Sequence, residues 1–243
     1  MSAPTPLNFR RPTVLAGAAA AAVSLSAAIG ALTTGVAVAD PAPPCPEVEV
    51  VFARGTFEAP GIGATGQAFI DALNARVGTP VAVYGVNYPA TLDFPAAVDG
   101  VVDASQKIES IVATCPDTKI VLGGYSQGAA VAAYTTFDEI PPGLTLPPGI
   151  GPMPPATAEH VDAVALFGTP DNWFLNLVDS AAPPITVGHL YSDKTIQLCA
   201  TGDPVCFPGG FDRAAHSSYK SNGMADQAAA FVADRLASAP SSN

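Results

Sequence analysis

The sequence is poor in charge and in histidine. Only 13% of its 243 residues are charged, and it contains three histidines and one tryptophan. Neither C-x-x-C nor H-E-x-x-H occurs, and the histidines lie far apart, so we expect no metal site. The hydrophobic share of 49% is ample for a large core, and much of the surface must then consist of small, weakly polar side chains.

Basic residues are also scarce. Ten Lys and Arg stand against 21 Asp and Glu, which gives a formal charge of −11. Without residues 1–39 the chain would keep 8 basic and 21 acidic side chains, a charge of −13. Because an acidic surface without a Lys/Arg cluster repels phosphate-rich partners, we expect no binding to nucleic acid or to anionic membrane surfaces.

The first 39 residues have the organisation of a secretory leader. Arg10-Arg11 precede an uncharged stretch from Pro12 to Ala39, which ends in the A-x-A motif Ala37-Val38-Ala39. This pattern predicts a signal peptide at 1–39 and a secreted, extracellular mature chain at 40–243, with no integral membrane association after cleavage. An uncleaved anchor is the alternative, disfavoured by the many Ala, Gly, Ser and Thr residues. The paired arginines leave the general secretory and twin-arginine routes both open.

All four cysteines follow the leader. An even number of cysteines in an exported chain favours disulfides. Cys45, Cys115, Cys199 and Cys206 allow three pairings. The short spacing between Cys199 and Cys206 favours a local bridge, which leaves Cys45 with Cys115.

Apolar periodicity predicts strands that alternate with helices. We expect strands at 48–52, 81–86, 119–122, 161–167 and, with weaker support, 185–191; we expect helices at 64–77, 97–114, 127–134 and 224–236. This alternation is typical of right-handed βαβ units, so the fold class is α/β, with a central, mainly parallel sheet flanked by helices in one catalytic domain. The segment 141–155 is too rich in Pro and Gly for regular structure and should be a surface loop.

The segment Gly124-Tyr125-Ser126-Gln127-Gly128 matches G-x-S-x-G. That pattern is weak alone, but here an apolar strand precedes it, small residues lie two positions before and after the serine, and a helix follows at once. These are the requirements of a nucleophile elbow. We therefore predict Ser126 as a nucleophile rather than a helix cap.

A serine nucleophile needs a histidine base. His160, His189 and His216 all follow Ser126, and His216 is the best placed, since it comes just before the last helix and after every serious acid candidate. His160 and His189 are then structural or surface residues.

The acid is harder to choose from the sequence. Six aspartates lie between Ser126 and His216: Asp138, Asp162, Asp171, Asp179, Asp193 and Asp203. Asp203 is favoured because it lies between Cys199 and Cys206, where a local bridge would restrain the loop. Asp171, which follows an apolar strand, is the alternative.

Four segments together resemble the cutinase family, in particular its bacterial, actinobacterial-type members. They are Phe52–Thr56, Gly123–Ala129, the Cys199–Cys206 loop around Asp203, and His216 before the last helix. The resemblance covers about residues 45–237 and implies a lidless three-layer α/β-hydrolase with two disulfides and a Ser126–Asp203–His216 triad. It also implies an oxyanion hole made by Thr56 and the backbone N–H of Gln127.

The resemblance implies a serine esterase without metal or organic cofactor. We expect a monomer that hydrolyses a small-molecule, lipid or polyester ester, with short to medium acyl chains. An acetylxylan esterase, or a lipid-directed esterase or phospholipase, is the near alternative; a non-catalytic secreted binding protein is the distant one. By analogy, Tyr88, Leu92, Phe94 and Phe207 to Phe211 are candidate acyl-chain walls, and the Pro-rich 141–155 segment is a departure that bears on substrate size.

Overall fold

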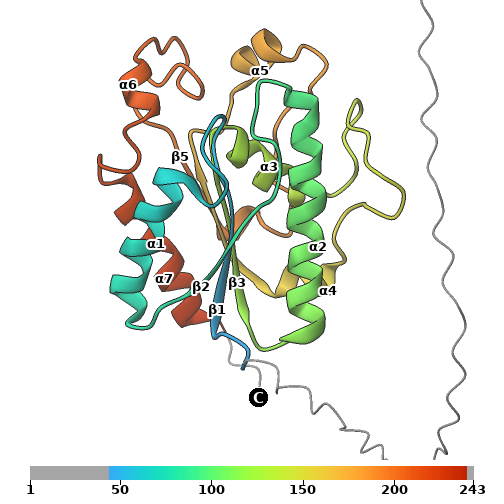
Figure 1. The fold of residues 1–243 in the computed structure, drawn as a ribbon, viewed down its shortest axis with the longest axis vertical. Helices are drawn as coiled ribbons and strands as arrows, with labels where there is room; N and C mark the ends of the chain where they lie inside the picture. The colour runs from blue at the N-terminus through green and yellow to red at the C-terminus, as the bar shows by residue number, and fades with distance from the viewer. Residues whose placement is uncertain (1–43, 240–243) are drawn as a thin grey trace, which may run out of the picture. The chain divides into compact units, whose positions relative to one another are not determined.

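The structure is a computed structural model that describes residues 44–239 (Figure 1). The expected signal peptide, 1–39, lies outside the described residues. The strands are β1 (Val48–Ala53), β2 (Ala82–Gly85), β3 (Lys119–Tyr125), β4 (Val161–Phe167) and β5 (Thr195–Leu198). The helices are α1 (Gly63–Val77), α2 (Val98–Thr114), α3 (Gln127–Thr135), α4 (Pro155–Glu159), α5 (Asn172–Val178), α6 (Arg213–His216) and α7 (Met224–Ser238), with 3-10 turns η1 (Phe94–Ala97) and η2 (Ser192–Lys194).

The five strands form one parallel sheet in the order β2-β1-β3-β4-β5. The chain moves outward from β1 to β2, then crosses to the other side of β1 for β3. The strand order therefore reverses between β1 and β3, and ligands in open α/β sheets bind at the carboxyl ends of strands at such a switch point. In Figure 1, α5 and α6 lie at this carboxyl end of the sheet.

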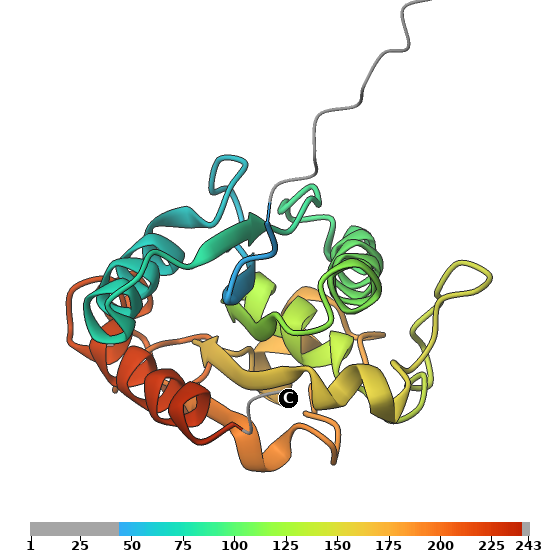
Figure 2. The same cartoon turned by 90° about the horizontal axis from the view of Figure 1, so that it is seen from below.

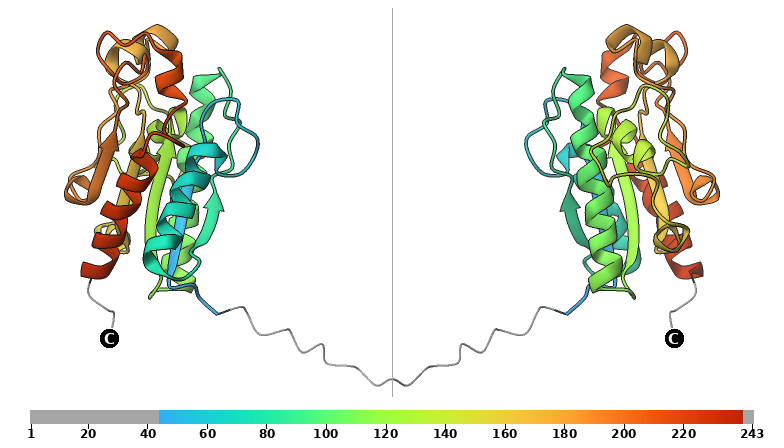
Figure 3. Two further views of the ribbon diagram at one scale, coloured as in Figure 1. Left: turned by 90° about the vertical axis from the view of Figure 1, so that its left-hand side faces the viewer. Right: turned by 90° about the vertical axis from the view of Figure 1, so that its right-hand side faces the viewer.

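Helices cover both faces of the sheet (Figure 2). Because side chains alternate along a strand, Val51 and Ala53 of β1 pack toward α2 and α3, whereas Val50 and Phe52 pack toward α1 and α7. Helices α1 and α7 are in contact along that second face (Figure 3). The central strands are buried on both sides over most of their length, which explains why most of their residues are apolar or glycine.

The predicted α/β class is confirmed, and most elements lie where periodicity placed them. Helix α1 ends at Val77, and Gly78 follows in the left-handed conformation (φ 76°), donating its N–H to Asn74 O. Glycine adopts this conformation without strain, and the helix ends at residue 77 as expected. No helix within residues 44–239 has the length and apolar character needed to cross a membrane.

The expected strand at 185–191 is wrong. This segment is irregular, and Gly188 packs so closely against the end of α3 that a Cβ there would lie 1.9 Å from Thr136 O. The fifth strand is instead β5, which pairs with β4. The Pro-rich segment has no helix or strand up to Pro154, and Pro155 begins α4, since proline is tolerated in the first turn of a helix.

Candidate active site

Ser126 lies at the sharp turn between β3 and α3. Its backbone has φ 56°, a left-handed conformation that is uncommon for a residue with a side chain. The Ser126 N–H donates to Phe167 O at 2.8 Å, and the Ser126 carbonyl accepts from Ala129 N and Ala130 N. The neighbouring strand and the first turn of the helix thus maintain the strained turn, as expected of a nucleophile elbow.

The two glycines of the motif are required by close backbone contacts. A Cβ on Gly124 would lie 2.1 Å from Gly128 O, and a Cβ on Gly128 would lie 2.0 Å from Ala53 O. Both distances are far below van der Waals contact, so neither position can take a larger residue without moving β1, β3 or α3.

Ser126, His216 and Asp203 form a continuous chain of hydrogen bonds. His216 Nε2 lies 2.9 Å from Ser126 Oγ, and His216 Nδ1 lies 2.9 Å from each carboxylate oxygen of Asp203. The Asp203 side chain is fully buried and that of His216 is 21% exposed. Ser126 is also partly exposed, so the outer end of the chain is open to solvent.

The carboxylate of Asp203 is surrounded by donors. The Val205 N–H donates to Oδ1 at 2.8 Å and the Tyr219 hydroxyl donates to Oδ2 at 2.5 Å. Burial acts to raise the pKa of Asp203, but the hydrogen bonds from His216, Tyr219 and Val205 outweigh it and keep the pKa below its usual value. The group is therefore an oriented, ionised carboxylate facing the imidazole.

Two tyrosines that the sequence analysis missed support this arrangement. Tyr219 is fully buried, accepts a bond from Ala200 N at 3.0 Å and packs edge-on to the His216 ring. Burial, then the bond to Asp203, raises the pKa of Tyr219. Tyr125 donates its hydroxyl to His216 O at 2.6 Å, and its ring lies over the imidazole. No motif marks Tyr219 in the sequence, and Tyr125 is signalled only by its place beside Ser126.

Thr56 and Gln127 meet beside Ser126. The Thr56 hydroxyl donates to Gln127 Oε1 at 3.3 Å, and the Gln127 amide donates to Thr91 O at 3.0 Å. Gln127 is the first residue of α3, so its N–H has no carbonyl partner within that helix. The partial positive charge of a helix N-terminus therefore faces the space next to the serine.

The loop that carries Thr56 is anchored by two charged residues, another feature missed from the sequence. Arg54 is almost fully buried and donates from Nε to Glu58 O at 2.9 Å and from an Nη to Tyr88 O at 2.7 Å. The Glu58 carboxylate accepts from Gly55 N at 2.7 Å and from the first turn of α1. Thr56 thus lies within a tightly bonded turn.

The alternative acid and the other histidines are engaged elsewhere. The Asp171 carboxylate caps α5 by accepting from Phe174 N at 2.7 Å. His189 Nδ1 lies 2.6 Å from exposed Asp138, and His160 follows α4 as its C-terminal cap. Of the six aspartates, Asp203 is thus the one in contact with His216.

A shallow pocket surrounds the serine. It is lined by Thr56, Phe57, Leu92, Phe94, Tyr125, Ser126, Gln127, Pro170, Phe174, Val205 and His216. Leu92 and Phe94 line it as expected, whereas Tyr88 is buried against Arg54 and Phe207 to Phe211 lie outside it. Within the described part of the chain, no group of three His, Cys, Asp or Glu side chains could hold a metal ion.

The disulfides are Cys45–Cys115 and Cys199–Cys206, the pairing that the spacing favoured. The shorter bridge closes the loop that contains Asp203. Cys206 Sγ also lies 3.3 Å from the Tyr219 hydroxyl, so the bridge is part of the surroundings of the carboxylate.

Comparisons with known proteins agree with this architecture. A model of the cutinase family matches residues 44–236. Probable carboxylesterase Culp5 of Mycobacterium tuberculosis is 53% identical over 69% of this chain and 95% of that protein, and phospholipase Culp4 of the same organism is 45% identical over 91% and 94%. A Trichoderma reesei cutinase solved with a phosphonate inhibitor is 33% identical, with a TM-score of 0.58 over 79% of this chain and 78% of that chain.

The catalytic core domain of a Trichoderma reesei acetyl xylan esterase has the same fold, with a TM-score of 0.65 at 24% identity over 79% of this chain and 100% of that chain. Fold and relatives together define a carboxylic ester hydrolase of the α/β-hydrolase class. The chain belongs to the cutinase family.

Proposed function

We propose that the chain is a secreted serine esterase that cleaves esters of short to medium acyl chains through a covalent acyl-enzyme. Ser126 is the nucleophile, His216 the general base and Asp203 the acid that orients it. The observation that carries the proposal is the unbroken Ser126–His216–Asp203 hydrogen-bond chain, which begins at a strained strand-to-helix turn.

In the first step Ser126 Oγ attacks the ester carbonyl carbon while His216 Nε2 takes the hydroxyl proton. The carbonyl oxygen becomes an oxyanion. We assign its stabilisation to the Gln127 N–H and to Thr56, which lie beside the serine and are rigidly positioned. The ionised Asp203 stabilises the imidazolium and keeps Nδ1–H directed toward itself.

His216 then passes the proton to the leaving alkoxide, and the alcohol departs, which completes the acyl-enzyme. Water then attacks the acyl-enzyme, with His216 acting again as base, and the acid product is released. These steps use only groups of the chain and water.

A lipid ester substrate is the second candidate. The relative named phospholipase Culp4 aligns with 91% of this chain at 45% identity, which favours this alternative over an acetylxylan ester, since the acetyl xylan esterase is similar only in fold. A non-catalytic binding protein is disfavoured, because it would not need an oriented carboxylate, imidazole and strained serine together.

The proposed location is extracellular. The leader pattern at 1–39 supports export, and two disulfides are typical of proteins that fold in an oxidising compartment. We further propose a monomer, which size-exclusion chromatography with light scattering would test.

The decisive experiment compares hydrolysis of p-nitrophenyl esters, from acetyl to palmitoyl, by the mature chain and by Ser126→Ala. Removing a triad serine lowers the reaction rate by many powers of ten, so we expect kcat to fall at least about 10⁴-fold. Ser110→Ala, which changes an exposed serine of α2, is the matched control and should retain activity. A fluorophosphonate should label the wild type and the control but not Ser126→Ala. Activity of Ser126→Ala within tenfold of wild type would refute the triad.

A further inference from the structure

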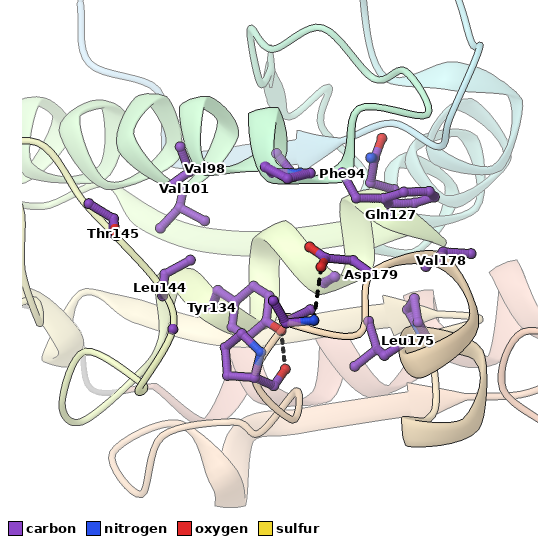
Figure 4. Close-up of a pocket in the computed structure, with 18 of the residues that line it drawn as sticks. Phe94, Val98, Val101, Gln127, Tyr134, Leu144, Thr145, Leu175, Val178 and Asp179 are labelled. Atoms are coloured by element: carbon purple, nitrogen blue, oxygen red, sulfur yellow. Dashed lines mark hydrogen bonds between the residues drawn. The ribbon is translucent and has the colours of Figure 1, made fainter.

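A second, larger cavity adjoins the Ser126 pocket (Figure 4). It has a volume of about 280 Å³ and shares Phe94, Gln127, Pro170 and Phe174 with that pocket. From there it extends between the start of α2, helix α3, helix α5 and the Pro-rich segment, which contributes Gly143 to Thr145. Neither Ser126 nor His216 lines it, so the cavity lies beside the reacting atoms rather than around them.

The cavity suits an apolar ligand. Its walls include Val98, Val101, Leu144, Leu175 and Val178. Two polar side chains in the walls, Tyr134 and Asp179, are hydrogen-bonded within the protein, as Figure 4 shows. The Tyr134 hydroxyl donates to Pro183 O at 2.5 Å, and Asp179 Oδ1 accepts from Ala181 N at 3.0 Å.

The Gln127 side chain is likewise bonded to Thr56 and Thr91. A polar ligand would therefore lose hydration in this cavity and find few free partners among these side chains, whereas an alkyl chain gains from leaving water.

The reaction geometry determines which part of an ester reaches the cavity. The leaving oxygen must lie near His216 Nε2, because that atom supplies its proton. The acyl chain, on the other side of the carbonyl carbon, must then point away from His216. The Ser126 pocket and the second cavity have Phe94, Pro170 and Phe174 in common. An acyl chain attached at the carbonyl carbon thus has a direct route into the second cavity.

We propose that this cavity is the acyl-chain site and that it sets the chain-length preference, an inference that rests on the proposed function. Its volume of about 280 Å³ limits the length of chain that it can hold. Longer chains would have to protrude into solvent and gain little more. The Pro-rich segment thereby acts in selectivity, since Leu144 forms one wall.

The test narrows the cavity from two independent sides. Val178→Trp acts from the end of α5 and Leu144→Trp from the Pro-rich loop; both side chains are half-buried, so the larger ring can be accommodated by partial exposure. Leu177→Trp is the matched control, because Leu177 is 67% exposed on α5 and does not line the cavity. The readout is the ratio of kcat/KM for p-nitrophenyl decanoate to that for the acetate.

We expect both cavity variants to lower this ratio at least tenfold, the size of effect that a single lost methylene contact can produce, and Leu177→Trp to leave it unchanged. A ratio within twofold of wild type in both cavity variants overturns the proposal. Val178→Ala provides a second measurement: by enlarging the cavity it should move the preferred chain length upward by one or two carbons, and an unchanged optimum counts against the acyl-chain site.

Failure of the proposed function gives a different result. In that case Ser126→Ala would hydrolyse both esters like the wild type, whatever the cavity variants do. If instead hydrolysis depends on Ser126 but the ratio does not respond to the cavity, only the acyl-chain site is refuted.

Discussion

Replacement of Tyr219 by phenylalanine tests whether the surroundings of Asp203 are as important as the structure indicates. The change keeps the ring, which packs against Phe167 and His216, and removes only the hydroxyl. That hydroxyl donates to Asp203 Oδ2 and accepts from the buried Ala200 N–H. One substitution therefore removes a charge-assisted bond and leaves a backbone donor unpaired.

The expected cost follows from these two contacts. A hydrogen bond to a charged group contributes about 1.5–3 kcal/mol, and a buried donor left unpaired costs about 1–3 kcal/mol. Since the two effects share one atom and are not strictly additive, we expect the free energy of unfolding to fall by about 2–4 kcal/mol at pH 7. For a domain of this size that corresponds to a melting temperature lower by roughly 10 °C.

Part of the loss depends on pH. Because the folded pKa of Asp203 lies below its ordinary value, its ionised form contributes stability above the unfolded pKa of about 3.9, and this contribution disappears as the pH falls through the folded pKa. Without the Tyr219 hydroxyl the folded pKa should move upward. The stability difference between wild type and Tyr219→Phe should therefore be larger at pH 7 than at a pH well below the unfolded pKa of about 3.9.

Urea unfolding followed by circular dichroism at several pH values measures both effects. Tyr84→Phe is the control. The Tyr84 hydroxyl also bonds an aspartate, Asp103, but it is half-buried and neither residue belongs to the proposed triad or its surroundings. A loss below about 0.5 kcal/mol for Tyr219→Phe at pH 7, or an equal loss at a pH well below about 3.9, would refute this account of the carboxylate. In kinetics, kcat should fall about tenfold with little change in KM, because only Asp203 and His216 lose alignment.

Two further predictions concern other parts of the site. Double replacement of Cys199 and Cys206 by Ala should lower kcat at least about tenfold while circular dichroism still shows a folded chain. Replacing Cys45 and Cys115 should mainly lower the melting temperature, since bridges spanning 7 and 70 residues differ in their loop-entropy contribution to stability by about 2 kcal/mol. Full kcat in the Cys199/Cys206 variant would show that the loop around Asp203 does not need its bridge. Thr56→Val should lower kcat by about 10²-fold if the hydroxyl binds the oxyanion, and an unchanged kcat would leave that role to backbone N–H groups.

Local pattern was sufficient for the α/β architecture and for the elbow. The run Val161–Phe167 is a central strand because six of its seven residues are apolar and suited to burial on two faces, and that property is visible in the sequence. The elbow was equally visible, since Gly124 and Gly128 are required by contacts with residues close in sequence or on the adjacent strand. The fifth strand could not be located in this way. β5 has only four residues at the sheet edge and is specified by pairing with β4, while the more apolar segment 185–191 packs against α3 without forming a strand.

The choice of acid and the shape of the substrate site required the tertiary structure. Six aspartates were compatible with the order of the motifs, and only the fold brings Asp203 to His216 and surrounds it with Val205 and Tyr219. The cavity beside Ser126 is built from segments between Phe94 and Pro183 that have no common pattern. Periodicity and turn chemistry are local and can be inferred from neighbouring residues, whereas the environment of a carboxylate and the walls of a cavity depend on residues that become neighbours only when the chain is folded.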